Sequence, residues 1–284
     1  MRILITGGSG NLARELARVL RHSHELWIRT QMELDITLED EIRTFFAKIK
    51  PDLVINTAAL TDVDGCENQF SKALNVNGLG PYYLAKACME YGIILVHFST
   101  EMIFDGLQAT PYVETDCPNP LLAYGLTKYV GEQNIKRSGC KYAIMRTSWL
   151  FGGGVPKFVN KFVDRAKQQT SIKVVDDQIG SPTYTHDIAK AIDLYLEQPP
   201  TGIFHLANSG AASRLDMAKF IKKGLNLDCE LLPLSYKETK ISTYRPPHAI
   251  LESKYKDRYP FLRLRPWQEA LEEYLLSANS YNVR

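Results

Sequence analysis

The chain has 284 residues, of which 45% are hydrophobic and 23% charged, a composition typical of a globular protein that forms its core without disulfides. The 34 basic and 32 acidic residues are interleaved and leave a formal net charge of +2, which argues against a nucleic-acid-binding protein. The five scattered cysteines form no C-x-x-C pair, and neither a signal peptide nor an apolar stretch of about 18 residues is evident, so we expect a cytoplasmic protein without a zinc site or membrane contact.

The first half of the chain alternates short apolar runs with longer amphipathic segments. This alternation predicts a parallel sheet covered by helices on both faces. We expect strands at Arg2–Thr6, Glu25–Arg29, Leu53–Asn56, Ile93–Phe98 and Tyr142–Arg146. We expect helices at Leu12–Leu20, Leu38–Lys48, Ser71–Tyr91 and Tyr124–Lys136. Residues 1–150 are therefore predicted to form a Rossmann-type α/β domain with a doubly wound parallel sheet.

The pattern changes after about Phe151, where longer, proline-containing connections separate the amphipathic segments. We expect helices there at Lys157–Gln168, His186–Glu197, Ser213–Gly224 and Pro266–Leu275. We interpret residues 151–284 as mainly a smaller, partly interleaved α/β domain that binds the substrate. We leave open whether later segments of this part of the chain belong to the first domain.

A glycine-rich turn follows the first apolar run. Gly8-x-Gly10-x-x-Ala13 matches the dinucleotide-binding fingerprint and stands between a strand and a helix start. The glycines permit a tight turn and a close approach of the backbone, and the helix N-terminus attracts a pyrophosphate. We therefore expect Gly7 and Gly10 to bind a dinucleotide cofactor. A turn with a purely steric role is the alternative.

The end of the second predicted strand bears on which nicotinamide cofactor binds. An acidic residue there binds the ribose 2′-hydroxyl of NADH, whereas an arginine accommodates the 2′-phosphate of NADPH. This chain has Arg29-Thr30 and no acid at that place. The pattern favours NADPH, with NADH left open and a solvated Arg29 as the alternative.

Tyr124 and Lys128 form a Y-x-x-x-K pair on a predicted helix. Residues at i and i+4 share a helix face, so the phenol and the ammonium group would lie side by side. A nearby cation lowers the pKa of a phenol, which suits a general acid that protonates a carbonyl oxygen as hydride arrives. Taken alone, the pair has a simpler explanation as two residues on a solvated helix face.

The segment Ser99-Thr100-Glu101 follows the fourth predicted strand. Ligands of open α/β sheets bind beyond the carboxyl ends of the strands, so this segment and the Y-x-x-x-K pair are expected at one site. Thr100 would hydrogen-bond a substrate carbonyl and Tyr124. A hydroxyl satisfied by the local backbone is the alternative. We expect Thr100, Tyr124 and Lys128 to be catalytic.

Together, the glycine-rich start, the strand ending in Ser-Thr and the Y-x-x-x-K helix resemble the extended short-chain dehydrogenase/reductase superfamily. Further segments are similar to one branch of it, the dTDP-4-dehydrorhamnose reductase family. These segments are Asn56–Asp64 (N-T-A-A-L-T-D-V-D), Arg146–Gly152 (R-T-S-W-L-F-G), Asp177–Thr183 (D-Q-I-G-S-P-T) and Arg245-Pro246. They occur in family order, and the resemblance extends from Arg2 to about Leu275.

The resemblance implies a set of cofactor-binding residues, by position. They are Gly10, Asn11 and Leu12 at the pyrophosphate, Asp35 and Ile36 at the adenine, and Ala58, Ala59, Leu60 and Thr61 past the third strand, together with Arg29, Thr30, Tyr124 and Lys128. The alternative for Asp35 is a helix N-cap.

The resemblance also implies residues that face the sugar nucleotide, namely Val63, Thr100, Glu101, Trp149 and Arg245. Trp149 has an alternative role in the hydrophobic core, and Arg245 could equally pair with a surface carboxylate. Where the family usually has S-T-D-Y, this chain has Ser99-Thr100-Glu101-Met102. This departure leaves the sugar contacts open without affecting the expected hydride transfer.

Some members of the family have a magnesium-linked dimer contact that uses a glutamate of an early helix. Glu15 occupies that place, but His186-Asp187 stands where another acidic partner would be sought. We therefore predict no metal and leave open whether the protein is a monomer or a homodimer.

The resemblance implies that the protein reduces the C4 carbonyl of dTDP-4-dehydro-L-rhamnose with NADPH, giving dTDP-L-rhamnose for surface polysaccharide. One alternative is a reductase, epimerase or dehydratase of another nucleotide sugar; dehydratases typically have Asp-Glu after the threonine, whereas Glu101-Met102 stands here. Another is a non-catalytic, dinucleotide-binding regulatory subunit. Such subunits tend to lose part of the Thr/Tyr/Lys set, which is complete here.

Overall fold

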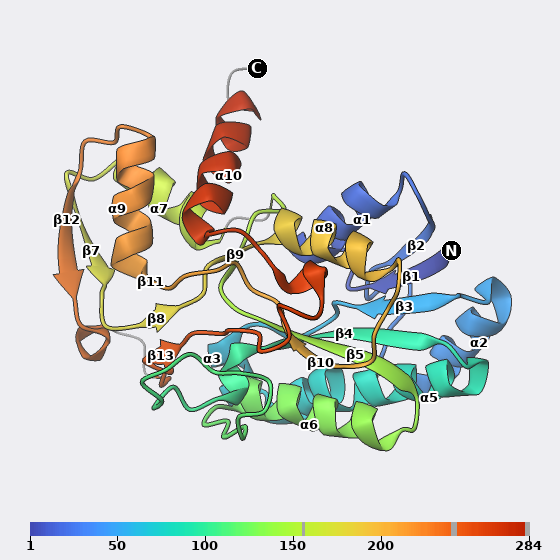
Figure 1. Cartoon of the computed structure of the whole chain (residues 1–284). Coiled ribbons are helices and arrows are strands. Elements are labelled where there is room, and N and C mark those ends of the chain that lie inside the picture. Colours follow the sequence, from blue (N-terminus) through green and yellow to red (C-terminus); the bar gives the residue numbers. More distant parts are fainter. Residues whose placement is uncertain (155–156, 240–242, 282–284) are drawn as a thin grey trace.

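The computed structural model describes residues 1–154, 157–239 and 243–281, without the side chains of 278–281. Six parallel strands of this part form one sheet in the order β10-β5-β4-β3-β1-β2 (Figure 1). They are β1 (Arg2–Thr6), β2 (Glu25–Arg29), β3 (Leu53–Asn56), β4 (Ile94–Thr100), β5 (Lys141–Thr147) and β10 (Gly202–His205). The chain begins in the middle of the sheet and extends it in both directions, so the expected doubly wound α/β fold is confirmed.

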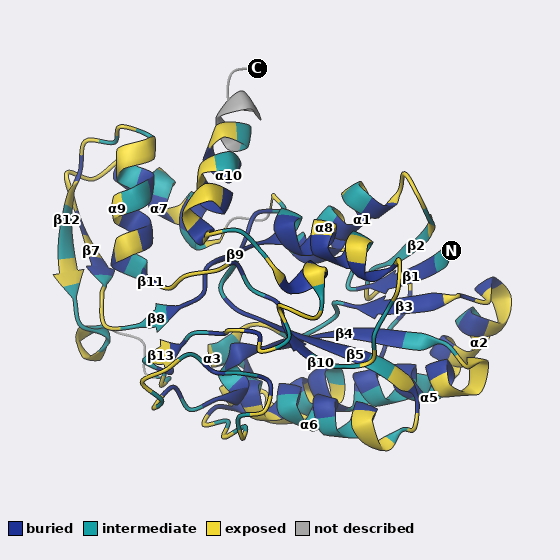
Figure 2. Ribbon diagram, in the orientation of Figure 1, coloured by how far each residue is buried: buried dark blue, intermediate teal, exposed yellow. Residues whose placement is uncertain are grey.

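Helices cover both faces of this sheet (Figure 1). One face packs on α1 (Asn11–Leu20) and α8 (Thr185–Tyr195), and the other on α2 (Glu39–Ile49), α5 (Gly80–Tyr91) and α6 (Ala123–Arg137). Alternate strand residues serve the two cores: Ile3 and Ile5 face α1, whereas Leu4 faces the opposite side. Figure 2 accordingly shows buried strands between helices whose outer faces are exposed. Among the described residues, no helix is long and apolar enough to cross a membrane.

Two elements after residue 150 belong to this sheet and its cover. β10 pairs with β5 at one edge, and α8 packs against α1. Sequence analysis did not predict β10, because a four-residue run is too short to show a period and its partner strand is distant in the chain. β4 also continues two residues past the predicted Phe98, so Thr100 is the last residue of the strand.

The predicted helix Ser71–Tyr91 is interrupted. The structure has α3 (Val63–Asn68), α4 (Phe70–Leu74), a π-helical turn η1 (Asn75–Leu79) and then α5. π-helical turns are rare and often occur at functional sites. This one buries Asn77, which lies within the turn.

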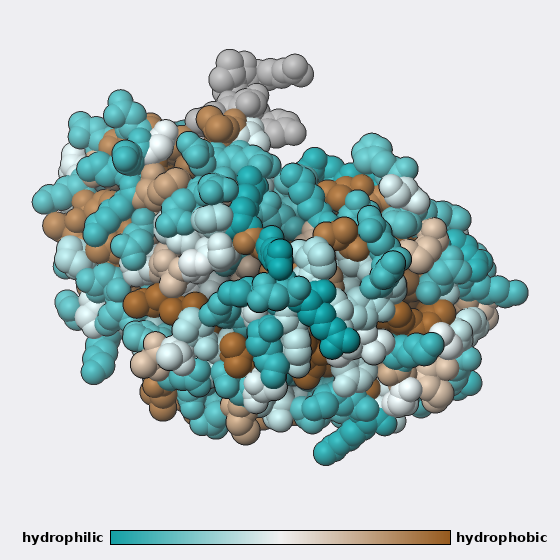
Figure 3. All heavy atoms as spheres, viewed as in Figure 1, coloured by the Kyte–Doolittle hydropathy of each residue, from teal (hydrophilic) through white to brown (hydrophobic). Residues whose placement is uncertain are grey.

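The smaller lobe has its own hydrophobic core, built on short paired strands and three helices. The strands are β6 (Leu150–Phe151), β7 (Ser171–Val175), β8 (Ile179–Gly180), β9 (Thr183–Tyr184), β11 (Ala212–Ser213), β12 (Glu230–Leu234) and β13 (His248–Ala249). The helices are α7 (Phe158–Ala166), α9 (Arg214–Gly224) and α10 (Trp267–Tyr281). Short 3-10 turns are η2 (Glu101–Ile103), η3 (Tyr236–Glu238) and η4 (Pro260–Leu262). In Figure 3 the visible surface is mostly hydrophilic, with small scattered apolar patches.

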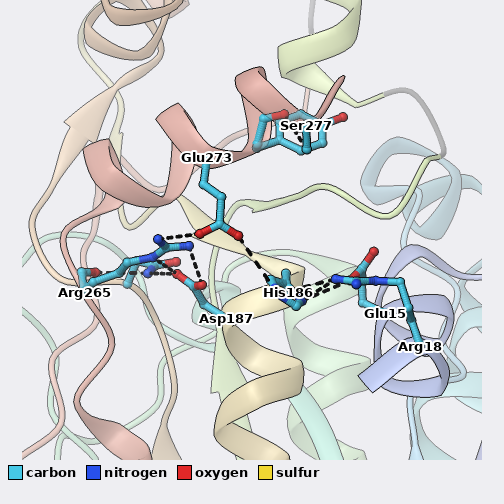
Figure 4. A network of polar contacts seen from close by, with 9 residues as sticks. Glu15, Arg18, His186, Asp187, Arg265, Glu273 and Ser277 are labelled. Carbon is cyan, nitrogen blue, oxygen red and sulfur yellow. Dashed lines mark hydrogen bonds and ion pairs between the residues drawn. The ribbon is translucent and has the colours of Figure 1, made fainter. Parts of the chain in front are cut away.

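A polar network joins the two lobes (Figure 4). Arg265 binds Asp187 of α8 at 2.8 Å and Glu273 of α10 at 2.7 Å. His186 lies 3.4 Å from Glu15 of α1, and 4.0 Å from Glu273. The carboxylates near Glu15 thus face basic groups, and in the described residues no cluster of His, Cys, Asp and Glu suited to a metal ion is found.

A buried ion pair between α6 and β5 provides a test of how the sheet is held. Glu132 and Arg146 have side chains 0% and 3% exposed and form two hydrogen bonds of 2.7 and 3.1 Å. Glu132→Ala should lower the free energy of unfolding by about 3–5 kcal/mol, because it leaves the guanidinium buried and unpaired. Urea denaturation measures this loss. Glu252→Ala, which breaks the exposed pair with Lys256, should lower the free energy of unfolding far less. Equal losses in the two variants would contradict a stabilising role for the buried Glu132–Arg146 pair.

Candidate active site

The glycine-rich loop connects β1 with α1 and is held by the neighbouring strands. Gly7 has φ +76°, and a side-chain carbon there would lie 2.6 Å from the amide nitrogen of Ala58 after β3. The N–H of Gly8 donates to the carbonyl of Arg29 at 2.8 Å. Gly10 is the N-cap of α1 and has no side chain to cap the first helical turn. The loop therefore packs closely on the segment after β3 and presents the N-terminus of α1, where an anion is able to bind.

Arg29 ends β2 beside this loop, and Thr30 follows it. The Arg29 guanidinium stacks on Trp27 and Phe45, with 5.3 and 5.0 Å to the ring centroids. The backbone N–H and hydroxyl of Thr30 both donate to Glu33, at 2.9 and 2.8 Å, and these hydrogen bonds lower the pKa of that carboxyl. The Glu33 carboxylate therefore lies near the end of β2, although the sequence has no acidic residue at Arg29-Thr30 itself.

Asp35 and Ile36 form the turn that follows. Asp35 accepts hydrogen bonds from the backbone N–H and hydroxyl of Thr37, at 2.9 and 2.7 Å. It therefore caps a turn, whereas the N-cap of α2 is Leu38. Ile36 is buried, and its side chain lies where a Cβ at Gly80 would be placed.

The segment Ala58-Ala59-Leu60-Thr61 follows β3 and is held by Asn77. Asn77 accepts from the N–H of Leu60 at 2.8 Å and donates to its carbonyl at 3.1 Å. It also donates to Thr127, the neighbour of Lys128 on α6, at 3.2 Å. Sequence analysis missed Asn77, because nothing in its local pattern marks the π-helical turn.

The expected catalytic residues meet where β4 and α6 approach each other. Thr100 ends β4, and its hydroxyl donates to Glu101 at 2.8 Å. Tyr124 lies in the first turn of α6, and its side chain forms a hydrogen bond with that of Thr100. The backbone packs so tightly here that a side-chain carbon at Gly125 would overlap the carbonyl oxygen of Met102.

Lys128 occupies a different environment from the one its spacing predicts. Its Nζ donates to the carbonyl of Phe98 at 2.6 Å and lies 3.2 Å from Nε2 of His97. Burial lowers the pKa of Lys128 to about 8. Burial, followed by the charge of Glu101, raises the pKa of Tyr124. The expected lowering of the Tyr124 pKa by Lys128 is therefore wrong for the ligand-free protein, since the Lys128 amino group contacts β4.

Glu101 is buried beside Thr100, with 5% of its surface exposed. Burial raises its pKa to about 7, while the hydrogen bond from Thr100 and the charge of Arg214 oppose the shift. The carboxyl therefore changes charge near neutral pH, and it both accepts and, when protonated, donates hydrogen bonds.

Glu101 borders a cavity of about 410 Å³ between the two lobes. The cavity is lined by Glu101, Met102, Trp149, Phe158, Lys161, Phe162, Arg165, Lys173, Val174, Val175, Gln178, Arg214, Tyr236, Arg245, Pro246 and Ala249. Three of the expected substrate residues, Glu101, Trp149 and Arg245, are thus brought together. Val63 does not line the cavity; it begins α3 beside Asp64, which binds Arg245 at 2.9 Å.

Four basic residues of this cavity were missed in the sequence: Lys161 and Arg165 on α7, Lys173 on β7 and Arg214 on α9. The Arg214 guanidinium lies 3.6 Å from the ring centroid of Trp149 and 4.9 Å from that of Phe158. Burial lowers the pKa of Arg214 to about 10. The capping box of Ser213 and Asp216 marks the start of α9 in the sequence, but only the tertiary fold places Arg214 at the cavity.

Comparisons with known proteins show the family to which this chain belongs. The family described as RmlD substrate binding domain matches residues 1–280. The chain belongs to the dTDP-4-dehydrorhamnose reductase family. It is 37% identical over 280 residues to the spore coat polysaccharide biosynthesis protein SpsK of Bacillus subtilis, covering 98% of each chain. Family membership makes the protein an enzyme, an oxidoreductase.

Two solved structures share the fold closely. A dTDP-4-dehydrorhamnose reductase of Clostridium acetobutylicum superposes with a TM-score of 0.95 at 36% identity, covering 98% of this chain and 100% of the other. The Bacillus anthracis dTDP-4-dehydrorhamnose reductase, solved in complex with NADP, has a TM-score of 0.94 at 33% identity, covering 97% and 99%.

The close packing at Gly7 predicts the effect of one methyl group on cofactor binding. Gly7→Ala should weaken NADPH binding by more than about tenfold, because the new carbon overlaps the backbone after β3 and the positive φ disfavours a side chain. Titration followed by NADPH fluorescence measures this. Gly92→Ala is the matched control, since Gly92 also has a positive φ of 68° but open space around it. Unweakened binding in Gly7→Ala would remove the loop from the cofactor site.

Proposed function

We propose that this enzyme reduces the C4 carbonyl of dTDP-4-dehydro-L-rhamnose with NADPH, giving dTDP-L-rhamnose for surface polysaccharide. The observation that carries the proposal is the meeting of Thr100, Tyr124 and Lys128 beside a basic cavity, in a chain of this family. The relative SpsK, named for polysaccharide biosynthesis, and the NADP complex of the Bacillus anthracis reductase support the assignment.

The loop at β1 fits a dinucleotide. Its positive-φ glycine leaves no side chain between the loop and β3, and the start of α1 offers backbone N–H groups to a pyrophosphate. We assign cofactor binding to Gly7, Gly10, Asn11 and Leu12 in this loop, to Arg29, Thr30, Asp35 and Ile36 at the adenosine, to Ala58, Ala59, Leu60 and Thr61 after β3, and to Tyr124 and Lys128. NADPH supplies the hydride when bound.

The residues of the chain supply the proton and the positioning. Tyr124 donates its proton to the carbonyl oxygen as that oxygen gains charge, and its raised pKa keeps the phenol protonated until then. Thr100 orients the same oxygen through its hydroxyl. Lys128, when charged, stabilises the phenolate that remains on Tyr124.

The cavity charge supports a nucleotide-linked substrate. Lys161, Arg165, Lys173 and Arg214 line it together with one carboxyl, Glu101, whose pKa is about 7. A diphosphate carries the opposite charge and accepts hydrogen bonds from such groups. Val63, Glu101, Trp149 and Arg245 are assigned to the nucleotide sugar on the same grounds.

We infer a cytoplasmic enzyme that acts as a monomer or homodimer on small molecules, without nucleic acid, membrane or metal partners. The near balance of acidic and basic residues supports the absence of a nucleic-acid partner. The ion pairs around Glu15 support the absence of the metal, because basic groups already face its carboxylate.

The direct test is to mix the protein with dTDP-4-dehydro-L-rhamnose and follow loss of reduced-cofactor absorbance with NADPH and, separately, NADH. We expect rapid oxidation of NADPH, and the ratio of the two rates reports on Arg29-Thr30 and the nearby Glu33. NADPH that binds without being oxidised would point to another nucleotide sugar or to a regulatory subunit.

A second test concerns the proton donor. Tyr124→Phe should lower turnover by roughly 10²–10⁴-fold, because it removes the only atom that delivers the proton in this scheme, and should leave NADPH binding nearly unchanged. Steady-state kinetics and cofactor titration measure the two effects. Tyr129→Phe, on the same helix, is the control and should retain activity. Unchanged turnover in Tyr124→Phe would exclude Tyr124 as the acid.

A further inference from the structure

A buried histidine contacts the catalytic lysine and has no part in the chemistry described above. His97 lies on β4, is 0% exposed, and places Nε2 3.2 Å from Nζ of Lys128. Its other ring nitrogen, Nδ1, lies 3.0 Å from Nδ2 of Asn56 on β3. If Nε2 of His97 carries the ring proton, Lys128 faces a hydrogen-bond donor. If Nδ1 carries it, Lys128 faces an acceptor.

The orientation of Asn56 settles this. Its Oδ1 accepts the backbone N–H of Ala58 at 3.0 Å and the hydroxyl of Thr6 at 2.7 Å. A backbone N–H only donates, so the atom that faces Ala58 must be the amide oxygen. The amide nitrogen consequently faces His97 and donates to Nδ1.

A neutral imidazole whose Nδ1 accepts a hydrogen bond carries its proton on Nε2. That N–H points at Lys128, which must then supply a lone pair. A neutral amine has one and still has hydrogens to donate to Phe98, whose carbonyl oxygen is 2.6 Å away. An ammonium group has no lone pair and would set donor against donor.

The geometry points to His97 as a positioning residue that holds Lys128 on β4 and favours its neutral amine over the ammonium form in the ligand-free protein. The inference rests on the proposed function only in assigning Lys128 to the reaction. When the neutral Lys128 leaves His97 to serve Tyr124, it takes up one proton from solvent and becomes the cation that the phenolate requires.

Burial acts in the same direction. It lowers the pKa of Lys128 to about 8, so the amine is the main form above that pH, and it lowers the pKa of His97 well below its ordinary value, so the imidazole stays neutral. Glu132 opposes the shift at Lys128, but its carboxylate is paired with Arg146 at 2.7 Å. Elsewhere on α6, the charge of Glu101 on η2 acts on Tyr124, whereas Cys66 on α3 is a neutral thiol near pH 7 because burial raises its pKa to about 11. Asn77 on η1 is uncharged.

Nuclear magnetic resonance of the ligand-free protein tests the inference directly. The ¹⁵N shifts of His97 should show a proton on Nε2 and none on Nδ1. The ¹³Cε signal of Lys128, assigned by its loss in Lys128→Met, should titrate with a midpoint near 8. A proton on Nδ1, or a lysine midpoint at the ordinary value of about 10.4, would overturn the proposal.

Two variants separate a specific role from simple burial. Asn56→Asp places a carboxylate against Nδ1, which should move the proton to Nδ1 and raise the Lys128 midpoint, since Nε2 then accepts from an ammonium group. His97→Gln can turn a carbonyl toward Lys128 and should raise the midpoint without a histidine. His205→Gln, which replaces a buried histidine on β10 of the same sheet, is the control and should leave the Lys128 midpoint unchanged.

An unmoved lysine midpoint in both folded variants would contradict the proposal. Should either variant fail to fold, the tautomer of His97 in the unaltered protein decides on its own. Because these measurements need neither cofactor nor sugar, a failed reductase assay leaves their result intact, and the two proposals fail separately.

Discussion

The close approach of α6 to the carboxyl end of β4 is the constraint on which the candidate site depends. It requires a glycine at 125, because any side-chain carbon there would overlap the carbonyl oxygen of Met102. With the helix this near, Tyr124 reaches the hydroxyl of Thr100, and Lys128 is drawn into the sheet as far as the carbonyl of Phe98. The same proximity buries Lys128 and partly buries Tyr124, and this loss of water is the largest cause of the shift in the pKa of each.

Another face of α6 is linked, through Asn77, to the segment that follows β3. A side-chain carbon at Gly131 would overlap the carbonyl oxygen of Asn77, so the π-helical turn packs directly on the helix. The Asn77 side chain then bridges Leu60, after β3, and Thr127 of α6. Through Asn77, α6 is therefore linked to the segment after β3 that is expected to bind the cofactor, and the same helix carries Tyr124, the proposed proton donor.

Sequence patterns predicted the parts of this site that depend on local order. The glycine loop, the end of β4 and the Y-x-x-x-K helix all lie at the carboxyl edge of the sheet, because alternation of strands and helices leaves few other arrangements. The patterns did not predict β10 or the place of Arg214, since both depend on contacts between distant segments. They also misjudged the pKa of Tyr124: helical spacing shows which side chains share a face, but not which of them is buried against another element.

The departures from the family pattern at positions 101 and 102 acquire a physical meaning in the cavity. Met102 cannot donate the hydrogen bond that a tyrosine hydroxyl would give, yet the Arg214 guanidinium lines the same cavity and carries five N–H donors. Stacking on Trp149 at 3.6 Å fixes its plane and leaves the edges of the group to bind oxygen. Glu101, with a pKa near 7, adds either a donor or an acceptor beside Thr100. Arg214 of α9 and Glu101 of η2 thus place hydrogen-bonding groups suited to oxygen atoms in the cavity that Met102 also lines.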